Sequence, residues 1–127
     1  MKKKLFIFIS LLYITPLQLH SINFSHYCQL SQLGKAPSSI THTVNTLLVA
    51  ANTTDCKLAF KRLNQMTYLS LANKNLTSAQ PFYGITNLKY LDLSHNQIRS
   101  LWGVEDNKSL QFLRLSQNKI SDIRKDT

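Results

Sequence analysis

Residues 88–98 read Leu-Lys-Tyr-Leu-Asp-Leu-Ser-His-Asn-Gln-Ile, and the architecture of the chain can be predicted from their spacing. Its apolar residues and its asparagine recur at the same spacing in residues 110–120, with no insertion between the two copies. A weaker copy lies one period upstream in residues 66–76, where Lys74 replaces the asparagine. A constant period of this size is typical of stacked repeats. The chain is therefore predicted to present a recognition surface, and catalysis is the less favoured class of function.

A short strand is predicted within each copy. Leu91 and Leu93 alternate with Tyr90, Asp92 and Ser94, which is the period-two pattern of a half-buried strand. One such unit cannot bury its apolar side alone, so the strands of successive copies should lie side by side in a parallel sheet. Each buried leucine or isoleucine contributes roughly 1.5–3 kcal/mol, so that three stacked units with a cap can hold a core.

The asparagines of the repeat have a predicted structural role. After the strand the chain bends inward and leaves backbone N–H and C=O groups without partners, and a buried primary amide can satisfy both kinds. Asn96 and Asn118 are therefore expected to form a hydrogen-bonded ladder beneath the turn. Lys74 breaks this ladder in the first copy, where Asn73 or Asn75 is an alternative after a shift of register.

Written as L-x-x-L-x-L-x-x-N-x-L, the pattern resembles the leucine-rich repeat, most closely in residues 88–101 and 110–123. Residues 76–88 resemble the return segment of 22-residue repeats of the internalin type, which carry a Pro-apolar pair and a Gly before Thr-Asn-Leu. The resemblance implies a short right-handed α/β solenoid with parallel strands and a helical or 3₁₀ turn on its convex side. In the second copy Asn107 stands where the first has Ile85, which departs from the pattern.

The N-terminal region has the pattern of a secretory signal peptide. Three lysines follow Met1, residues 5–14 are apolar except for Ser10, and Ser21 is the expected last residue removed. The apolar run is shorter than the roughly 20 residues of a comfortable membrane span. We therefore expect residues 1–21 to be a signal peptide of a secreted or periplasmic protein without stable membrane insertion after cleavage. An uncleaved anchor is the alternative.

Export bears on the two cysteines, Cys28 and Cys56. In an oxidising compartment a lone pair is most simply a disulfide. Closing this loop would stabilise the fold by about 3–4 kcal/mol in the chain-entropy model. No signature of a nucleophilic cysteine surrounds either residue, and a metal site would require more ligands at short spacing.

Two helices are predicted before the repeats. Within residues 38–64, the first has the apolar spacing of an amphipathic helix and ends before residues 52–54, with Ser38, Ser39 and Thr41 as candidate N-caps. Its apolar face is formed by Ile40, Val44, Leu47, Leu48 and Ala51. The second starts near Asp55, where a negative charge favours a helix N-terminus. Its apolar face is formed by Cys56, Ala59, Phe60 and Leu63. Residues 25–37 receive no assignment beyond Cys28.

Residues 47–56, with Ala59 and Leu63, are similar to the helical N-terminal cap of bacterial exported leucine-rich repeat proteins. Solenoid ends expose apolar surface and require such a cap. The resemblance implies a disulfide-containing helical cap over residues 22–64. Three repeats, the last incomplete, then occupy residues 65–127.

The outward residues of the strands are predicted to line up in columns on the concave face of the sheet. Exposed aromatic and arginine side chains are enriched at protein-binding hot spots. The candidate partner-binding residues are Tyr68, Tyr90, Asp92, His95, Phe112 and Arg114. The alternative for the aromatic residues is that they stabilise neighbouring strands. The expected function is binding of a protein partner, and the alternative is a structural protein that binds glycan or cell envelope.

No catalytic or metal-binding constellation is visible in the sequence. Asp92 and His95 lie three residues apart, but no Ser or Cys is placed to complete a triad. We therefore expect no enzymatic activity, no cofactor and no metal.

The basic character of the chain does not indicate nucleic-acid binding. The formal charge of +9 falls to +6, 12 basic minus 6 acidic residues, when the three lysines at the N-terminus are removed. The remaining basic residues are scattered, whereas nucleic-acid binding favours a clustered basic face. The incomplete last copy has three possible explanations: truncation of the chain, self-association through an uncapped C-terminal end, or a partner that completes the stack.

Overall fold

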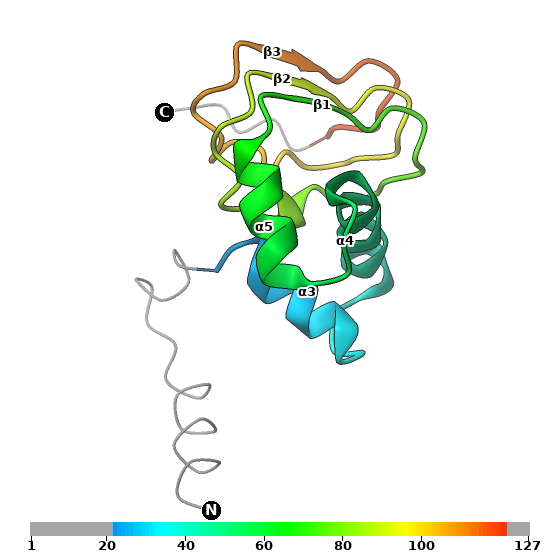
Figure 1. Cartoon of the computed structure of the whole chain (residues 1–127). Helices are drawn as coiled ribbons and strands as arrows, with labels where there is room; N and C mark the ends of the chain where they lie inside the picture. Colours follow the sequence, from blue (N-terminus) through cyan, green and yellow to red (C-terminus); the bar gives the residue numbers. More distant parts are fainter. Residues whose placement is uncertain (1–21, 122–127) are drawn as a thin grey trace, which may run out of the picture.

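The computed structural model describes residues 22–121, so the predicted signal peptide and residues 122–127 lie outside the described part. Three helices come first, and short strands joined by long coils follow (Figure 1). The elements are α3 (Phe24–Gln32), α4 (Ser38–Ala51), α5 (Cys56–Gln65), β1 (Tyr68–Ser70), the 3₁₀ helix η1 (Gln80–Phe82), β2 (Tyr90–Asp92) and β3 (Phe112–Arg114). The helices gather on one side of the strands, and α5 leads directly into β1.

The three strands form one parallel sheet in the order β1-β2-β3. Leu69 pairs with Leu91, which in turn pairs with Leu113, so equivalent residues of successive copies lie beside one another. The predicted parallel pairing is confirmed, and the sheet and helices together make a small α/β repeat fold.

The leucines of the repeat lie in an apolar core that the coils share with the helices. Leu91, Leu93 and Ile98 of the middle copy are fully buried. In β3, which has a strand neighbour on one side only, Leu113 is 36% exposed. The middle copy is therefore buried from both sides, and the last one is covered on one side among the described residues.

The predicted start of α5 is confirmed, and the predicted caps of α4 are wrong. The Asp55 carboxylate accepts a hydrogen bond of 2.8 Å from the backbone N–H of Leu58. Helix α4 instead begins after Pro37, whose side chain makes no capping bond. The proline ring presets the backbone at the helix entry. Ser38 is already the first helical residue, so its hydroxyl is not at the capping position.

Helix α3 was not predicted. Its N-cap is Asn23, whose side chain accepts from the backbone N–H of Ser25 at 2.9 Å. Only Phe24 and Cys28 of this helix are buried, so its apolar periodicity is weak. The helix is held by tertiary bonds, which the sequence pattern does not display.

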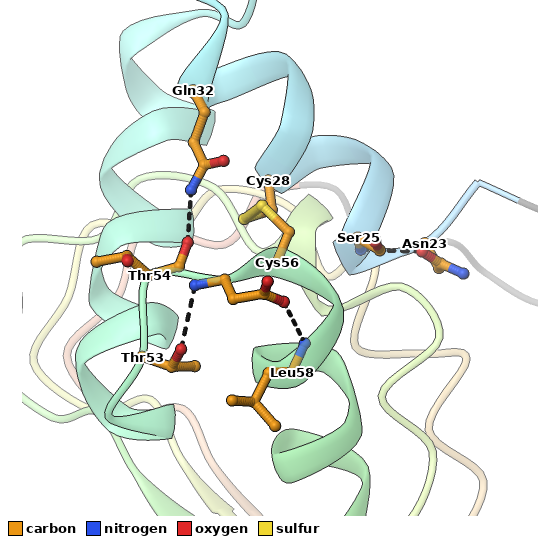
Figure 2. The surroundings of a disulfide bond; sticks show 9 residues. Asn23, Ser25, Cys28, Gln32, Thr53, Thr54, Cys56 and Leu58 are labelled. Carbon is orange, nitrogen blue, oxygen red and sulfur yellow. Dashed lines mark hydrogen bonds between the residues drawn. A yellow bond between two sulfur atoms is a disulfide. The ribbon is translucent and has the colours of Figure 1, made fainter.

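The strongest of these bonds is a disulfide between Cys28 of α3 and Cys56 of α5 (Figure 2). A hydrogen bond of 2.7 Å from the Gln32 side chain to the carbonyl of Thr54 ties the end of α3 to the loop before α5. At its other end, the backbone N–H of Phe24 donates to the Tyr83 carbonyl at 2.8 Å. Helix α3 is thus joined both to α5 and to the first coil of the repeats.

The Asn96 side chain joins two successive coils. Its oxygen accepts from the backbone N–H groups of Lys74 and Leu76, both at 3.0 Å, in the preceding copy. Its nitrogen donates to the carbonyls of Leu71 in that copy and Leu93 in its own, both at 2.9 Å. The nitrogen also donates to the Ser94 carbonyl at 3.3 Å. Because the amide supplies two donors and an acceptor oxygen, it bonds five backbone groups in a buried turn.

Asn118 repeats this arrangement one copy later, with bonds to the N–H of Ile98 and the carbonyls of Leu93 and Leu115. Each amide therefore bonds to the backbone of two coils. The predicted ladder of asparagines is therefore observed in a different form. The two amides bond backbone groups of the coils, and the backbone links one amide to the next.

The first copy keeps the predicted register, and the alternative of a shift does not occur. Residues 68–70 pair with residues 90–92 without a shift, so Lys74 keeps the place equivalent to Asn96. Asn73 and Asn75 remain exposed, with left-handed backbone φ angles of 58° and 56°. Because Asn96 reaches back to bond the turn of the first copy, that turn requires no asparagine of its own at position 74.

Asn107 occupies the place that Ile85 has one copy earlier, and this exchange predicts a stabilising substitution. Asn107 is 5% exposed, and neither polar atom of its side chain has a hydrogen-bond partner within the described region. An unsatisfied buried amide costs about 1–3 kcal/mol. Asn107→Ile is therefore expected to raise the free energy of unfolding by about 1–3 kcal/mol, measured by urea denaturation.

The reverse exchange, Ile85→Asn, is the matched control, because Ile85 is fully buried at the equivalent place. It is expected to lower the free energy of unfolding. A less stable Asn107→Ile variant would contradict the assignment of Asn107 as an unsatisfied group.

Candidate functional site

Three aromatic side chains lie in one column across the outward face of the sheet, which we call the sheet face. Tyr68, Tyr90 and Phe112 pair in register at the starts of β1, β2 and β3. The rings of Tyr68 and Tyr90 stack, with centroids 4.7 Å apart and planes 9° from parallel. Tyr68 is 63% exposed and Phe112 is 64% exposed. The column thus presents a large apolar area to solvent while its first two members support each other.

Asp92 lies on the same face at the end of β2 but is largely buried, with 9% exposure. One carboxylate oxygen accepts both from the Ser94 hydroxyl, at 2.6 Å, and from the Ser94 backbone N–H, at 2.9 Å. These two bonds lower the pKa of Asp92 below its ordinary value, and the nearby Arg114 and His95 add to the effect. Asp92 is therefore ionised at neutral pH and is held in place by its own turn.

Arg114 lies in register with Asp92 at the end of β3. A side-chain hydrogen bond with Tyr90, and to a smaller extent the charge of Asp92, raise the pKa of Arg114 above its ordinary value. Residue 114 is exposed. The structure thus brings Tyr90, Asp92 and Arg114 together on neighbouring strands.

His95 lies in the turn that follows β2, with its side chain exposed. Its backbone has a left-handed φ of 58°, and Asn73 and Gln117 at the equivalent places have nearly the same angle. The backbone N–H of His95 donates to the Ser116 carbonyl at 2.9 Å. His95 is therefore at the rim of the sheet face, and its polar side chain suits a position that requires a positive φ.

A groove that was not predicted adjoins the sheet face. It has a volume of about 290 Å³ and lies between α4 and the end of β1. Its lining residues are Thr46, Val49, Ala50, Ser70, Leu71 and Lys74. Val49 is 81% exposed on α4. In the sequence, Val49 is an apolar residue that lies outside the predicted apolar face of the helix, and this was the available signal. Only the packing of α4 against the first copy shows that Val49 adjoins a groove.

Within residues 22–121, no three His, Cys, Asp or Glu side chains gather in a way that could hold a metal ion. The helices of the same region are too short or too polar to cross a membrane.

Comparison of the sequence with models of protein families also identifies the repeats. A family model described as leucine rich repeat matches residues 52–98 and, in a second overlapping alignment, residues 64–120. The two alignments together cover more than half of the chain. The chain belongs to the leucine-rich repeat family. Comparisons with curated proteins and with solved structures gave no match.

Leucine-rich repeat domains generally mediate protein–protein interactions, and they are typically binding modules without catalytic activity. Both family alignments include β1 and β2, and the second also includes β3. The sheet face of this leucine-rich repeat chain therefore lies within the matched region.

Proposed function

We propose that the chain is an exported leucine-rich repeat module that binds a protein partner through the sheet face, as the concave side of a short solenoid. The observation that carries the proposal is the exposure of Tyr68 and Phe112, 63% and 64%, beside Arg114. Aromatic and arginine side chains are enriched at the centres of protein interfaces. Contiguous exposed apolar groups with polar neighbours mark binding surfaces on soluble domains.

Strand stabilisation explains only part of the aromatic column. Stacking of Tyr68 on Tyr90 supports the pairing of β1 with β2. Phe112 is as exposed as Tyr68, lies on β3 at the edge of the sheet, and is not part of the stacked pair. Its exposure is better explained by an interface that covers it in the complex.

The proposed export rests on the signal pattern of residues 1–21 and on the disulfide. A bond between Cys28 and Cys56 persists in an oxidising compartment, which is compatible with a secreted or periplasmic protein. We further propose that residues 22–64 act as an N-terminal cap for bacterial-type repeats in residues 65–127. Helices α4 and α5, which share the core with the repeats, support this division. Self-association through the C-terminal end stays a prediction.

Removal of the exposed rings tests the proposal. A Tyr90→Ala/Phe112→Ala double variant of the mature chain is expected to weaken partner binding at least 30-fold, because the loss of even one hot-spot side chain costs about 2 kcal/mol. Affinity capture with the parent chain and mass spectrometry identify the partner, and calorimetric titration with that partner measures the loss.

The matched control is Leu33→Ala, which removes an apolar side chain that is 67% exposed at the end of α3, away from the sheet. It should bind as the parent does. Circular dichroism should show the same spectrum for all three proteins. Full binding by the folded double variant would contradict the proposed use of the sheet face.

A further inference from the structure

Val49 forms an exposed apolar ridge between two hollows on α4. On one side is the groove of about 290 Å³ that reaches Ser70 and Lys74. On the other side is a hollow of about 510 Å³, lined by Asn45, Leu48, Val49 and residues 52–54. With 81% exposure, Val49 is more accessible than Tyr68 or Phe112. An aliphatic side chain that stands free between two hollows is available to insert between side chains of a bound partner.

The groove beside Val49 opens onto the sheet face. Ser70, which lines the groove, pairs in register with Asp92, and Asp92 pairs with Arg114. One row of residues therefore leads from the groove across all three strands. The aromatic column runs beside this row, because Tyr68, Tyr90 and Phe112 come two residues earlier in the same strands. The groove and the sheet face therefore share Ser70, so that one bound segment can contact both.

The walls of the groove are fixed by hydrogen bonds between α4 and the first copy. The His42 ring nitrogen Nε2 lies 2.7 Å from the Lys74 carbonyl, and the Thr43 hydroxyl donates to the Ser78 carbonyl at 2.6 Å. Both bonds join residues far apart in the sequence and hold the helix against the coil. A groove formed in advance requires little ordering when a partner binds, which favours affinity.

The charge along this route is positive. Lys74 is exposed at the groove, and Arg114 is exposed at the other end of the row. Asp92, the acidic residue between them, is 9% exposed and already accepts two hydrogen bonds from Ser94. A partner therefore meets two accessible cations, with apolar side chains beside them. Complementary charge favours encounter with an acidic chain and disfavours a basic one.

On this basis we infer that the partner-binding surface continues from the sheet face through the Lys74 groove to Val49, and that it receives an acidic protein segment carrying apolar side chains. This inference rests on the proposed function of the sheet face. An acidic segment would place carboxylates at Lys74 and Arg114 and apolar groups against Val49 and the aromatic column. The interleaving of cations with apolar groups suits a peptide better than a phosphate backbone, which requires a row of cations.

Selection from a library of random 12-residue peptides displayed on phage, with the mature chain as target, tests the inference. The expected result is enrichment of Asp and Glu together with aliphatic or aromatic residues. The strongest selected peptide, labelled with fluorescein, is then titrated with the chain and its variants by fluorescence anisotropy. Its affinity should fall as the salt concentration rises, because salt screens the charge pairs.

Two variants address the groove itself. Lys74→Glu and Val49→Ser are each expected to weaken binding of the peptide about tenfold or more. Both side chains are exposed, so the fold should tolerate the changes, and thermal unfolding verifies this. The matched control is Lys35→Glu, which makes the same change of charge in the loop between α3 and α4, far from the sheet (Figure 1). It should leave the affinity unchanged.

The outcomes separate this inference from the proposed function. If Tyr90→Ala/Phe112→Ala abolishes binding while Lys74→Glu and Val49→Ser do not weaken it, the proposed role of the groove is wrong and the proposed use of the sheet face is supported. Selection of basic or uncharged peptides would contradict the inference that the partner segment is acidic. If the Tyr90→Ala/Phe112→Ala variant also binds with unchanged affinity, both the proposed function and the proposed groove are wrong. Loss of binding in the sheet-face and groove variants, with full binding by Lys35→Glu, supports both.

Discussion

Replacement of both cysteines by alanine is expected to lower the free energy of unfolding by about 3–4 kcal/mol, the largest effect that we predict. The disulfide joins residues 28 positions apart, and the crosslink restricts the unfolded chain over that whole loop. A domain of this size has about 5–15 kcal/mol of stability in total, so the loss is a large part of it. Urea denaturation followed by circular dichroism measures the difference.

Alanine is the appropriate replacement because Cys28 is fully buried and Cys56 is 7% exposed, and serine would add hydroxyl groups that require partners. The control is Ser31→Ala on the same helix, which removes a buried hydroxyl that has no hydrogen-bond partner within residues 22–121. This control should not lose stability. An unchanged urea midpoint in the double alanine variant would show that the crosslink does not stabilise the fold.

Loss of the disulfide is expected to destabilise α3 more than the other helices and strands. Besides the disulfide, hydrogen bonds from Gln32 to Thr54 and from Phe24 to Tyr83 join α3 to the rest of the fold. Hydrogen exchange is expected to show faster exchange in α3 than in β2, because β2 is paired on both sides. Since α3 does not line the sheet face or the groove, partner binding should persist wherever the variant remains folded.

Replacement of Asn96 by alanine is expected to cost about 3 kcal/mol of unfolding free energy. The amide bonds five backbone groups, in residues 71, 74, 76, 93 and 94, and the variant leaves them without this partner. Each buried group left unsatisfied costs about 1–3 kcal/mol, and water that enters the space of the lost amide recovers part of the cost. Thermal and urea denaturation of the purified variant measure the effect.

Asn118→Ala is the matched control for this prediction. Asn118 makes the equivalent bonds one copy later, but its side chain is partly exposed and solvent can replace those bonds. Its replacement is expected to cost clearly less than that of Asn96. Equal losses at the two positions would contradict the argument that burial makes the Asn96 bonds strong.

Much of the repeat region could be predicted because its residues carry a period. Leu69, Leu91 and Leu113 are spaced equally, so their strands had to pair in register if the copies stacked. The helix start at Asp55 was predictable for a similar reason, since an acidic residue at that place bonds the next backbone N–H groups locally. Interactions that repeat or that lie within one turn leave a signal in the sequence.

Other features depend on contacts between distant residues and left no such signal. Helix α3 buries only Phe24 and Cys28, so its pattern is too weak to read without the disulfide partner in α5. Asp92 was expected to be an exposed member of the candidate site. The Ser94 bonds and the surrounding strands instead leave it 9% exposed, so that Arg114 becomes the accessible charge there.

The sequence by itself determined the stacking of equal coils, because side chains that recur at a constant interval can be buried together only if the copies pile up in register. The surface beside the sheet face, by contrast, depends on how the helices pack against the repeats. The groove at Lys74 and the exposed side chain of Val49 arise where α4 packs on the first copy, and the hydrogen bond between His42 and Lys74 there joins residues 32 positions apart. A local pattern cannot encode such a junction, because its shape depends on how two elements dock.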